Sequence, residues 1–265
     1  MVTGQKVKGT AAVQGELWGA RARDYADIQE GMTRPLFEAG LRALNVGAGT
    51  VLLDVGCGPG MAAQIAAQRG ARVSGIDASA PFIAIARERT PQGDFRVGEM
   101  EDLPFADHTF DVVTGFNSFQ YAASPVNALK EARRVAKPGA KVLIAVWGKP
   151  DQLEFMPVIK ALGSLMPPPG APGPFALSED GALETLASQA GLTPAAVYDV
   201  DCTFNFPDLE TALRGMLSGG PAVKAVNLAG EERVREAVTN AISPYRMADG
   251  SCRLENQFRY LIATA

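Results

Sequence analysis

The stretch from Val51 to Gly60 constrains the fold of this chain more than any other. It begins with Val-Leu-Leu-Asp-Val, an apolar run with one carboxylate at Asp54, and ends in alternate glycines at Gly56, Gly58 and Gly60. This order predicts a buried strand followed by a tight turn, and residues 61–69 have a helical pattern. Because glycine has no Cβ and tolerates positive φ, the turn lets backbone approach a ligand at the helix N-terminus.

Strand and helix patterns alternate after this turn. We predict strands at 51–55, 72–76, 94–97, 110–116 and 141–147, with helices between most of them. Alternation at this spacing predicts a parallel sheet covered by helices on both faces. Two later extended runs, 195–206 and 253–262, suggest an antiparallel hairpin at the sheet edge. We therefore expect an α/β fold with a Rossmann-like, seven-stranded, mostly parallel sheet and an antiparallel last hairpin.

The segments outside this alternation are predicted to cover the sheet. Residues 1–45 should hold lid helices at 14–29 and 33–44, after a disordered leader over 1–12, with Thr33 as an N-cap. Residues 46–150 should form the cofactor-binding core. Residues 151–265 should contribute a proline-rich cap, a helix capped by Ser178 that runs to Ala190, further helices and the last two strands. We expect all three parts to belong to one domain.

Composition excludes several classes of function. The net charge of −4 and the pI of about 5.2 lack the basic footprint of a nucleic-acid-binding protein. No apolar run approaches the ~18 residues that a membrane span needs. Three scattered cysteines and a single histidine predict neither a disulfide framework nor a metal site. We expect a cytoplasmic protein, monomeric or homodimeric, whose partner is a small molecule.

A glycine turn after a strand is compatible with dinucleotide binding, where G-x-G-x-x-G places a pyrophosphate on a helix N-terminus. The spacing here is G-x-G-x-G, and Asp54 lies two residues before the first glycine. A carboxylate at that position suits a ligand with a cationic amino group better than it suits a pyrophosphate. A NAD(P)-dependent oxidoreductase therefore stays open as an alternative.

Four segments together resemble the class I S-adenosylmethionine-dependent methyltransferases, in the small-molecule branch related to the ubiquinone and menaquinone biosynthesis enzymes. They match in order and spacing over roughly residues 45–150. The segments are Leu53-Asp-Val-Gly-Cys-Gly-Pro-Gly60, Gly75-Ile-Asp77, Gly98-Glu-Met-Glu-Asp-Leu-Pro-Phe-Ala-Asp-His-Thr-Phe-Asp111 and Arg133-Arg-Val-Ala-Lys-Pro-Gly-Ala140. The resemblance implies S-adenosylmethionine as the cofactor and S-adenosylhomocysteine as its product, and it does not identify the acceptor.

The resemblance also implies a set of cofactor-binding residues. Asp77 would accept from the ribose hydroxyls, Glu99 from the adenine amino group, and the N–H of Met100 would donate to the ring. The full expected set is Asp54, Gly56, Cys57, Gly58, Gly60, Asp77, Ala78, Glu99, Met100 and Asn117, with Trp18 and Tyr25 from the lid. Candidates for the substrate pocket are Gln120, Tyr121 and Trp147.

The expected function is transfer of a methyl group to an O, N or C atom of a small molecule by in-line displacement. Alignment of the reactants and exclusion of water would supply the rate enhancement, and no catalytic residue is assigned. If the acceptor needs a base, Tyr25, Glu16 and Tyr245 are candidates that the sequence does not rank. The apolar, proline-rich cap favours an apolar acceptor, aromatic or polyketide-like. A cofactor-binding or cyclase-like protein that transfers no methyl group is a further alternative.

Overall fold

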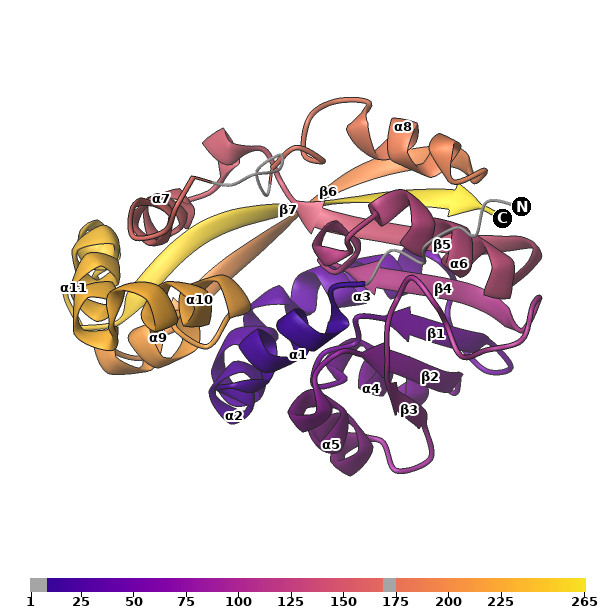
Figure 1. Cartoon of the computed structure of the whole chain (residues 1–265), viewed down its shortest axis with the longest axis horizontal. Helices are drawn as coiled ribbons and strands as arrows, with labels where there is room; N and C mark the ends of the chain where they lie inside the picture. The colour runs from indigo at the N-terminus through magenta and orange to yellow at the C-terminus, as the bar shows by residue number, and fades with distance from the viewer. Residues whose placement is uncertain (1–8, 169–174) are drawn as a thin grey trace, which may run out of the picture.

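The computed structural model describes residues 9–168 and 175–265 of the chain. Its centre is a seven-stranded sheet in the order β3-β2-β1-β4-β5-β7-β6. The first five strands run parallel, and β7 is antiparallel to both of its neighbours (Figure 1). The predicted fold class is therefore confirmed. The strands are β1 (Val51–Val55), β2 (Arg72–Asp77), β3 (Asp94–Val97), β4 (Phe110–Phe116), β5 (Ala136–Trp147), β6 (Thr193–Phe206) and β7 (Cys252–Thr264).

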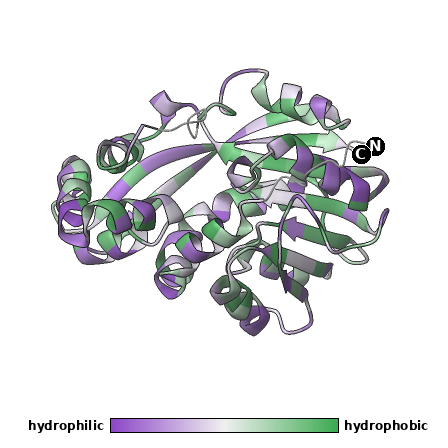
Figure 2. Cartoon of the chain, in the orientation of Figure 1, coloured by the Kyte–Doolittle hydropathy of each residue, from purple (hydrophilic) through white to green (hydrophobic). Residues whose placement is uncertain are grey.

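Helices cover both faces of the sheet, as predicted. Leu52 of β1 belongs to the apolar cluster that includes α3 and α4, whereas Leu53 and Val55 pack in the cluster that includes α6 and α8. Figure 2 shows the central strands as mainly hydrophobic and much of the outer helix surface as hydrophilic. These helices are α3 (Arg34–Ala43), α4 (Met61–Gln68), α5 (Ala80–Arg89), α6 (Pro125–Val135) and α8 (Ala182–Gln189).

The N-terminal lid differs from the single helix predicted over 14–29. It consists of α1 (Ala11–Gly19), α2 (Ala22–Asp24), a π-helical turn (Tyr25–Gln29) and a 3-10 turn (Glu30–Thr33). Arg21 interrupts the helix with φ −129° and ψ 43°. The chain changes direction at this break, and Ala22 and Ala26 beyond it are buried. The helical spacing of the apolar residues predicted helix, but it did not encode the break.

Two other details of the lid differ from the prediction. Thr33 occupies the N-cap position of α3, as predicted, but its side chain makes no capping hydrogen bond because its hydroxyl donates to the carbonyl of Glu30 at 2.8 Å. Of the predicted disordered leader over 1–12, residues 1–8 lie outside the described residues, and α1 already begins at Ala11.

The hairpin of β6 and β7 extends well past the parallel strands (Figure 1). Its far half carries α7 (Met156–Ser164), α9 (Leu209–Met216), α10 (Gly220–Ala229) and α11 (Glu231–Ile242), and we call this assembly the distal lobe. Its core is apolar and includes Phe204, Phe206 and Phe258. Short 3-10 turns occur at Phe119–Tyr121, Pro150–Gln152 and Ser243–Tyr245.

The second half of the chain departs from the prediction at three places. The helix expected from Ser178 begins only at Ala182, because the Ser178 hydroxyl donates to the carbonyl of Trp147 at 2.8 Å instead of capping. Helix α10 was missed because Gly219-Gly220-Pro221 is typical of a turn. Strand β5 begins five residues before the expected Lys141. Over residues 9–168 and 175–265, no helix is both long and apolar enough to cross a membrane.

Candidate cofactor and acceptor cleft

A cleft of about 870 Å³, its open mouth included, lies at the carboxyl ends of β1 to β4. The strand order reverses there. Strands β2 and β3 lie on one side of β1, whereas β4 and β5 lie on its other side. Ligands of open α/β sheets bind at such a switch point. Predicted residues that line the cleft are Trp18, Tyr25, Gly56, Gly58, Asp77, Ala78, Glu99, Met100, Asn117 and Tyr121.

The glycine turn forms the floor of the cleft. Gly56 and Gly58 have φ values of +69° and +53°, which favour glycine. A Cβ on Gly58 would meet no protein atom within 4 Å, so the space beside this backbone is open to a ligand. A Cβ on Gly56 would meet Ser118, whose hydroxyl donates to the carbonyl of Val55 at 2.6 Å. The turn therefore presents bare backbone to the cleft while its rear is tightly packed.

Asp54 supports this turn from below and does not line the cleft. Its carboxylate is 2% exposed and accepts from the hydroxyl of Thr114 on β4 at 2.7 Å. Burial raises the pKa of Asp54 to about 7, and the hydrogen bond from Thr114 opposes this shift. A cationic ligand group placed above the turn would offset the cost of holding this carboxylate charged.

Asp77 ends β2 and joins two loops. Its carboxylate accepts from the N–H of Gly58 at 2.9 Å and from the N–H of Ser79 at 2.8 Å. Burial raises the pKa of Asp77 to about 6, although these backbone donors lower it. Each carboxylate oxygen has a second lone pair, so Asp77 can hold the glycine turn and still accept from ligand hydroxyls in the cleft.

The loop after β3 carries Glu99 and Met100 to the cleft. Glu99 Oε1 accepts from the N–H of Glu101 at 3.1 Å, and Oε2 accepts from the N–H of Ala11 at 2.9 Å. Ala11 is the first residue of α1, so this carboxylate also anchors the lid. The sequence pointed to Glu99 as a ligand residue, but it gave no sign of this second role.

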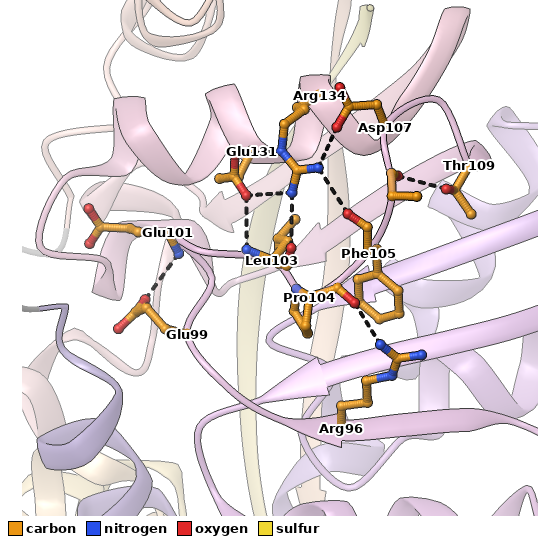
Figure 3. A network of polar contacts seen from close by, with 11 residues as sticks. Arg96, Glu99, Glu101, Leu103, Pro104, Phe105, Asp107, Thr109, Glu131 and Arg134 are labelled. Carbon is orange, nitrogen blue, oxygen red and sulfur yellow. Dashed lines mark hydrogen bonds and ion pairs between the residues drawn. The ribbon is translucent and has the colours of Figure 1, made fainter. Parts of the chain in front are cut away.

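Figure 3 shows what holds the rest of this loop in place. The Arg134 guanidinium on α6 donates to the carbonyls of Leu103 and Phe105, both at 2.9 Å, and forms ion pairs with Glu131 and Asp107. Glu131 in turn accepts from the N–H of Leu103 at 2.9 Å. The family-like segment 133–140 therefore contributes to the cleft indirectly, by fixing the loop that carries Glu99.

Aromatic rings close the cleft from the lid side. The Trp18 ring lies 5.5 Å from that of Tyr25 and 5.4 Å from that of Tyr121, in edge-to-face geometry. The Tyr25 ring lies 5.1 Å from that of Phe82 on α5. Burial raises the pKa of Tyr25 far above its usual range and that of Tyr121 to about 12. Both hydroxyls therefore stay protonated at neutral pH.

Asn117 directly follows β4 and lines the cleft. It has a φ of +54°, which is uncommon for a residue other than glycine. Its Oδ1 accepts from Nε2 of Gln120 at 2.6 Å, which leaves the Asn117 amide nitrogen as a donor at the cleft. Gln120 thus acts behind Asn117 and is not itself among the lining residues.

The remaining predicted residues lie away from the lining. Cys57 is buried within the turn, and Gly60 caps α4. Trp147 stacks on Phe258 with 4.4 Å between ring centroids and on Phe155 with 5.5 Å, so it belongs to an aromatic stack at the base of the distal lobe. Of the three candidate bases, Tyr25 lines the cleft, whereas Glu16 and Tyr245 do not.

Several cleft residues were not predicted from the sequence. Thr33, Leu36 and Phe37 enter from the start of α3, where the sequence predicted a helix with Thr33 as its N-cap and no contact with a ligand. The ring centroid of Phe37 lies 5.0 Å from that of Phe116 on β4, a residue for which the sequence was compatible with both the pocket and the core. Glu30 does not line the cleft; it is buried beneath the lid and joins the lid to the first residue of α4. No local pattern around Glu30 distinguished it from a solvated acid.

The cleft fits S-adenosylmethionine in three respects. Open backbone at Gly58 leaves room for close approach, and Asp77 offers an acceptor pair at the end of β2. The ionisable lining residues are two acids and two protonated tyrosines, which suits a cationic ligand. Among the described residues, no cluster of three or more His, Cys, Asp or Glu is placed to hold a metal ion.

Comparisons with known proteins agree with this geometry. A family model described as a methyltransferase domain matches residues 53–144. The chain is 30% identical over 199 residues to the malonyl-acyl carrier protein O-methyltransferase of Erwinia pyrifoliae, an alignment that covers 75% of this chain and 72% of that protein. It is 33% identical over 123 residues to a demethylmenaquinone methyltransferase of Paenarthrobacter aurescens, covering 46% and 49% of the two chains. The chain thus spans about half the length of this second relative.

Solved structures share the fold. An S-adenosylmethionine-dependent methyltransferase from Aquifex aeolicus superposes with a TM-score of 0.51 and 19% identity, over 68% of this chain and 92% of that chain. The 4+2 cyclase SpnF superposes with a TM-score of 0.52 and 22% identity, over 86% and 79%. At these identities the likeness shows the fold alone. Taken with the family model and the first relative, the site and the fold lead to one conclusion: the chain belongs to the S-adenosylmethionine-dependent methyltransferases.

Proposed function

We propose that this protein transfers the methyl group of S-adenosylmethionine to an uncharged, largely apolar small molecule. The observation that carries this proposal is the division of the cleft. Asp77 and Glu99 lie at the ends of β2 and β3, whereas Leu36, Phe37 and Phe116 line the part beside β4 and α3. The cofactor would occupy the acidic part and the acceptor the apolar part.

The charges of the lining restrict the acceptor further. No Lys, Arg or His is found among the described residues that line the cleft. No side chain of the protein would neutralise a carboxylate acceptor there, and desolvation of such a group without a protein counter-charge is costly. The name of the Erwinia relative refers to a malonyl acceptor, and that of the Paenarthrobacter relative to demethylmenaquinone. The cleft favours an acceptor of the second, uncharged kind.

The residues of the chain would act by positioning and by excluding water. When bound, the cofactor supplies an electrophilic methyl group on a sulfonium, so the protein need not activate it. Asp77 and the bare backbone at Gly58 would orient the adenosine and amino-acid parts. Tyr25 and Trp18 would close over them, and the Asn117 amide would donate to the cofactor or the acceptor. Such alignment supplies much of the rate enhancement in an in-line displacement.

Incubation with S-adenosylmethionine and a panel of acceptors tests this proposal. The panel should pair each neutral phenol or quinol with a carboxylic acid of matched size, and mass spectrometry should record the gain of one methyl group. We expect methylated products from neutral acceptors and none from the matched acids. Exclusive methylation of acids would contradict the assignment of the acceptor class.

A second candidate is a protein that binds the cofactor and transfers no methyl group. The fold-level likeness to a cyclase favours keeping this candidate, as does the absence of a strong base among the described lining residues. It predicts tight binding of S-adenosylhomocysteine together with no methylated product across the whole panel. The same experiment therefore separates the two candidates.

A further inference from the structure

Glu30 is a buried carboxylate that reaches from the lid to the helix after the glycine turn. Its side chain is 4% exposed, and Oε1 accepts from the N–H of Met61 at 2.9 Å. Met61 is the first residue of α4. The chain therefore places an anion of its own at the N-terminus of this helix, where free N–H groups and the helix dipole attract negative charge.

Arg89, at the end of α5, completes this arrangement. One of its nitrogens forms an ion pair with Glu30 and donates to the carbonyl of Pro59 at 3.0 Å, and another donates to the carbonyl of Ala26 at 2.8 Å. The Arg89 side chain is only 19% exposed. A single cation thus joins the lid, the glycine turn and α5.

Phosphate groups commonly bind to the free N–H groups of a helix N-terminus together with an arginine side chain. In dinucleotide-binding folds the pyrophosphate occupies this position after the glycine turn. We propose that Glu30 is a specificity-determining residue: it occupies the position that a pyrophosphate would take, neutralises Arg89, and so restricts the cleft to a cofactor without phosphates. This proposal rests on S-adenosylmethionine being the cofactor, as proposed above, and does not depend on which acceptor is methylated.

The surrounding charges agree with this role. Asp54 and Asp77 lie near enough to Glu30 for their charges to disfavour one another's ionisation. With Arg89 engaged by Glu30, three carboxylates face one guanidinium around the turn. This excess of negative charge favours a ligand with net positive charge, which S-adenosylmethionine has and a nucleoside diphosphate lacks.

Glu30 also holds the part of the lid that closes the cleft. Its N–H donates to the carbonyl of Tyr25 and completes the π-helical turn. Anchoring of Glu30 at α4 therefore sets the position from which Tyr25 enters the cleft. Single π-helical turns occur frequently at functional sites, and here the turn lets Tyr25 face the ligand while Glu30 faces the protein interior.

Removal of the carboxylate should expose the hidden anion site. In Glu30→Ala, Met61 N–H and Arg89 lose their partner, and the space of the side chain opens. We expect inorganic pyrophosphate to raise Tm by about 3 °C or more over sodium chloride of equal ionic strength, and to leave the wild type unchanged. The double variant Glu30→Ala/Arg89→Met should lose this gain. A folded Glu30→Ala that shows no such gain would overturn the proposal.

A second variant decides the matter if Glu30→Ala does not fold. Glu30→Gln keeps the shape and the hydrogen bond to Met61 but removes the negative charge. Calorimetry should then show that the preference for S-adenosylmethionine over S-adenosylhomocysteine, which has no net charge, falls about three- to tenfold, because the two ligands differ by one positive charge. An unchanged preference would contradict the proposal, since a merely structural role would weaken both ligands equally.

Glu88→Gln is the matched control for both variants. Glu88 is the neighbour of Arg89 on α5 and pairs with Arg23 of the lid, so it joins the same two elements. Its side chain is 57% exposed, however, whereas that of Glu30 is 4% exposed. Neither the response to pyrophosphate nor the preference between the two cofactor forms should change in this variant. A change equal to that of Glu30→Gln would overturn the proposal, because an exposed acid on α5 would then have the same effect as the buried Glu30.

Discussion

The glycine turn and the distal lobe are built on opposite physical principles. Around the turn, Glu30, Asp54 and Asp77 are held in low-dielectric surroundings that raise their pKa values. In the distal lobe, large apolar side chains such as Phe204 and Phe258 are completely buried, and ion pairs such as Arg235–Glu210 lie at the surface. Both regions connect to the same sheet, yet among the described residues only the first contains carboxylates whose pKa values are raised by burial.

This difference indicates where the chain gives up stability for function. Burial of a carboxylate without a full counter-charge destabilises the folded state, whereas burial of an aromatic ring stabilises it. The lobe can therefore support a turn that is unfavourable until a cationic ligand arrives. Substitutions in the lobe should therefore change stability and leave binding intact, whereas substitutions at the turn should mainly change binding.

The largest expected effect is on stability, from Phe258→Ala in the lobe. This ring is completely buried and stacks on Trp147, so its removal should lower the free energy of unfolding by about 3–5 kcal/mol. Urea titration measures this loss, and calorimetry should show S-adenosylhomocysteine affinity within about twofold of the wild type. Leu228→Ala, at a side chain 55% exposed on α10, is the control and should change stability by no more than about 0.5 kcal/mol. Parallel loss of affinity in folded Phe258→Ala would break the comparison.

The next largest effect is on binding, from Asp77→Ala at the turn. The substitution removes acceptors for the N–H groups of Gly58 and Ser79 and for ligand hydroxyls. Because hydrogen bonds to charged groups contribute about 1.5–3 kcal/mol each, we expect S-adenosylhomocysteine affinity to fall about 100-fold. Asp94→Ala, an exposed acid on β3 that pairs with Arg96, is the control. A loss below about threefold would exclude Asp77 from the cofactor site.

The sequence predicted the parallel sheet and the turn well, because these features are local. Apolar five-residue runs, the glycines and Asp77 each carry their own signal, and the family-like segments agree with them. The lid and Glu30 could not be predicted in this way. The break at Arg21, the π-helical turn and the contact between Glu30 and Met61 depend on packing between residues about thirty positions apart. Trp147 was expected in the pocket because it is the last residue of β5, whereas the rings of the distal lobe surround it.

The affinity for S-adenosylmethionine and the stability of the unliganded protein should both depend moderately on pH, because of the acids at the glycine turn. Asp54 and Asp77 have pKa values raised to about 7 and about 6, so both must lose a proton for the turn to carry full negative charge. Affinity for S-adenosylmethionine should therefore increase roughly tenfold or more from pH 5.5 to 8. The stability of the protein without ligand should change in the opposite direction. Because folding raises these pKa values, the folded state retains the protons better, and this contribution to stability is lost as pH rises from about 4 to 7.

Asp54→Asn is the variant that tests this explanation of the pH profile. Asparagine can still accept from Thr114, but it carries no charge to bury. The slope of affinity against pH should become shallower, and the unliganded protein should be as stable as the wild type or more so at pH 8. If the variant keeps the full wild-type slope, Asp54 is not the group that titrates.

The smallest expected effect comes from Glu99→Gln, at the contact between the cleft and the lid. This carboxylate accepts from Ala11 and Glu101, and one of these N–H groups would face an amide nitrogen in the variant. We expect a loss of affinity of about threefold to tenfold, because one charge-assisted hydrogen bond is weakened. Limited proteolysis should also cleave near α1 faster. Weaker binding with unchanged proteolysis would assign Glu99 to the ligand alone.

We infer that the glycine turn, with the acids around it, forms a site for a sulfonium cofactor and not for a dinucleotide. Calorimetric titration of the wild-type protein with S-adenosylhomocysteine, and separately with NADH, tests it most directly. The account predicts a one-to-one complex of micromolar or tighter affinity with S-adenosylhomocysteine and no measurable heat of binding with NADH. Tight binding of NADH, or no binding of S-adenosylhomocysteine, would contradict it.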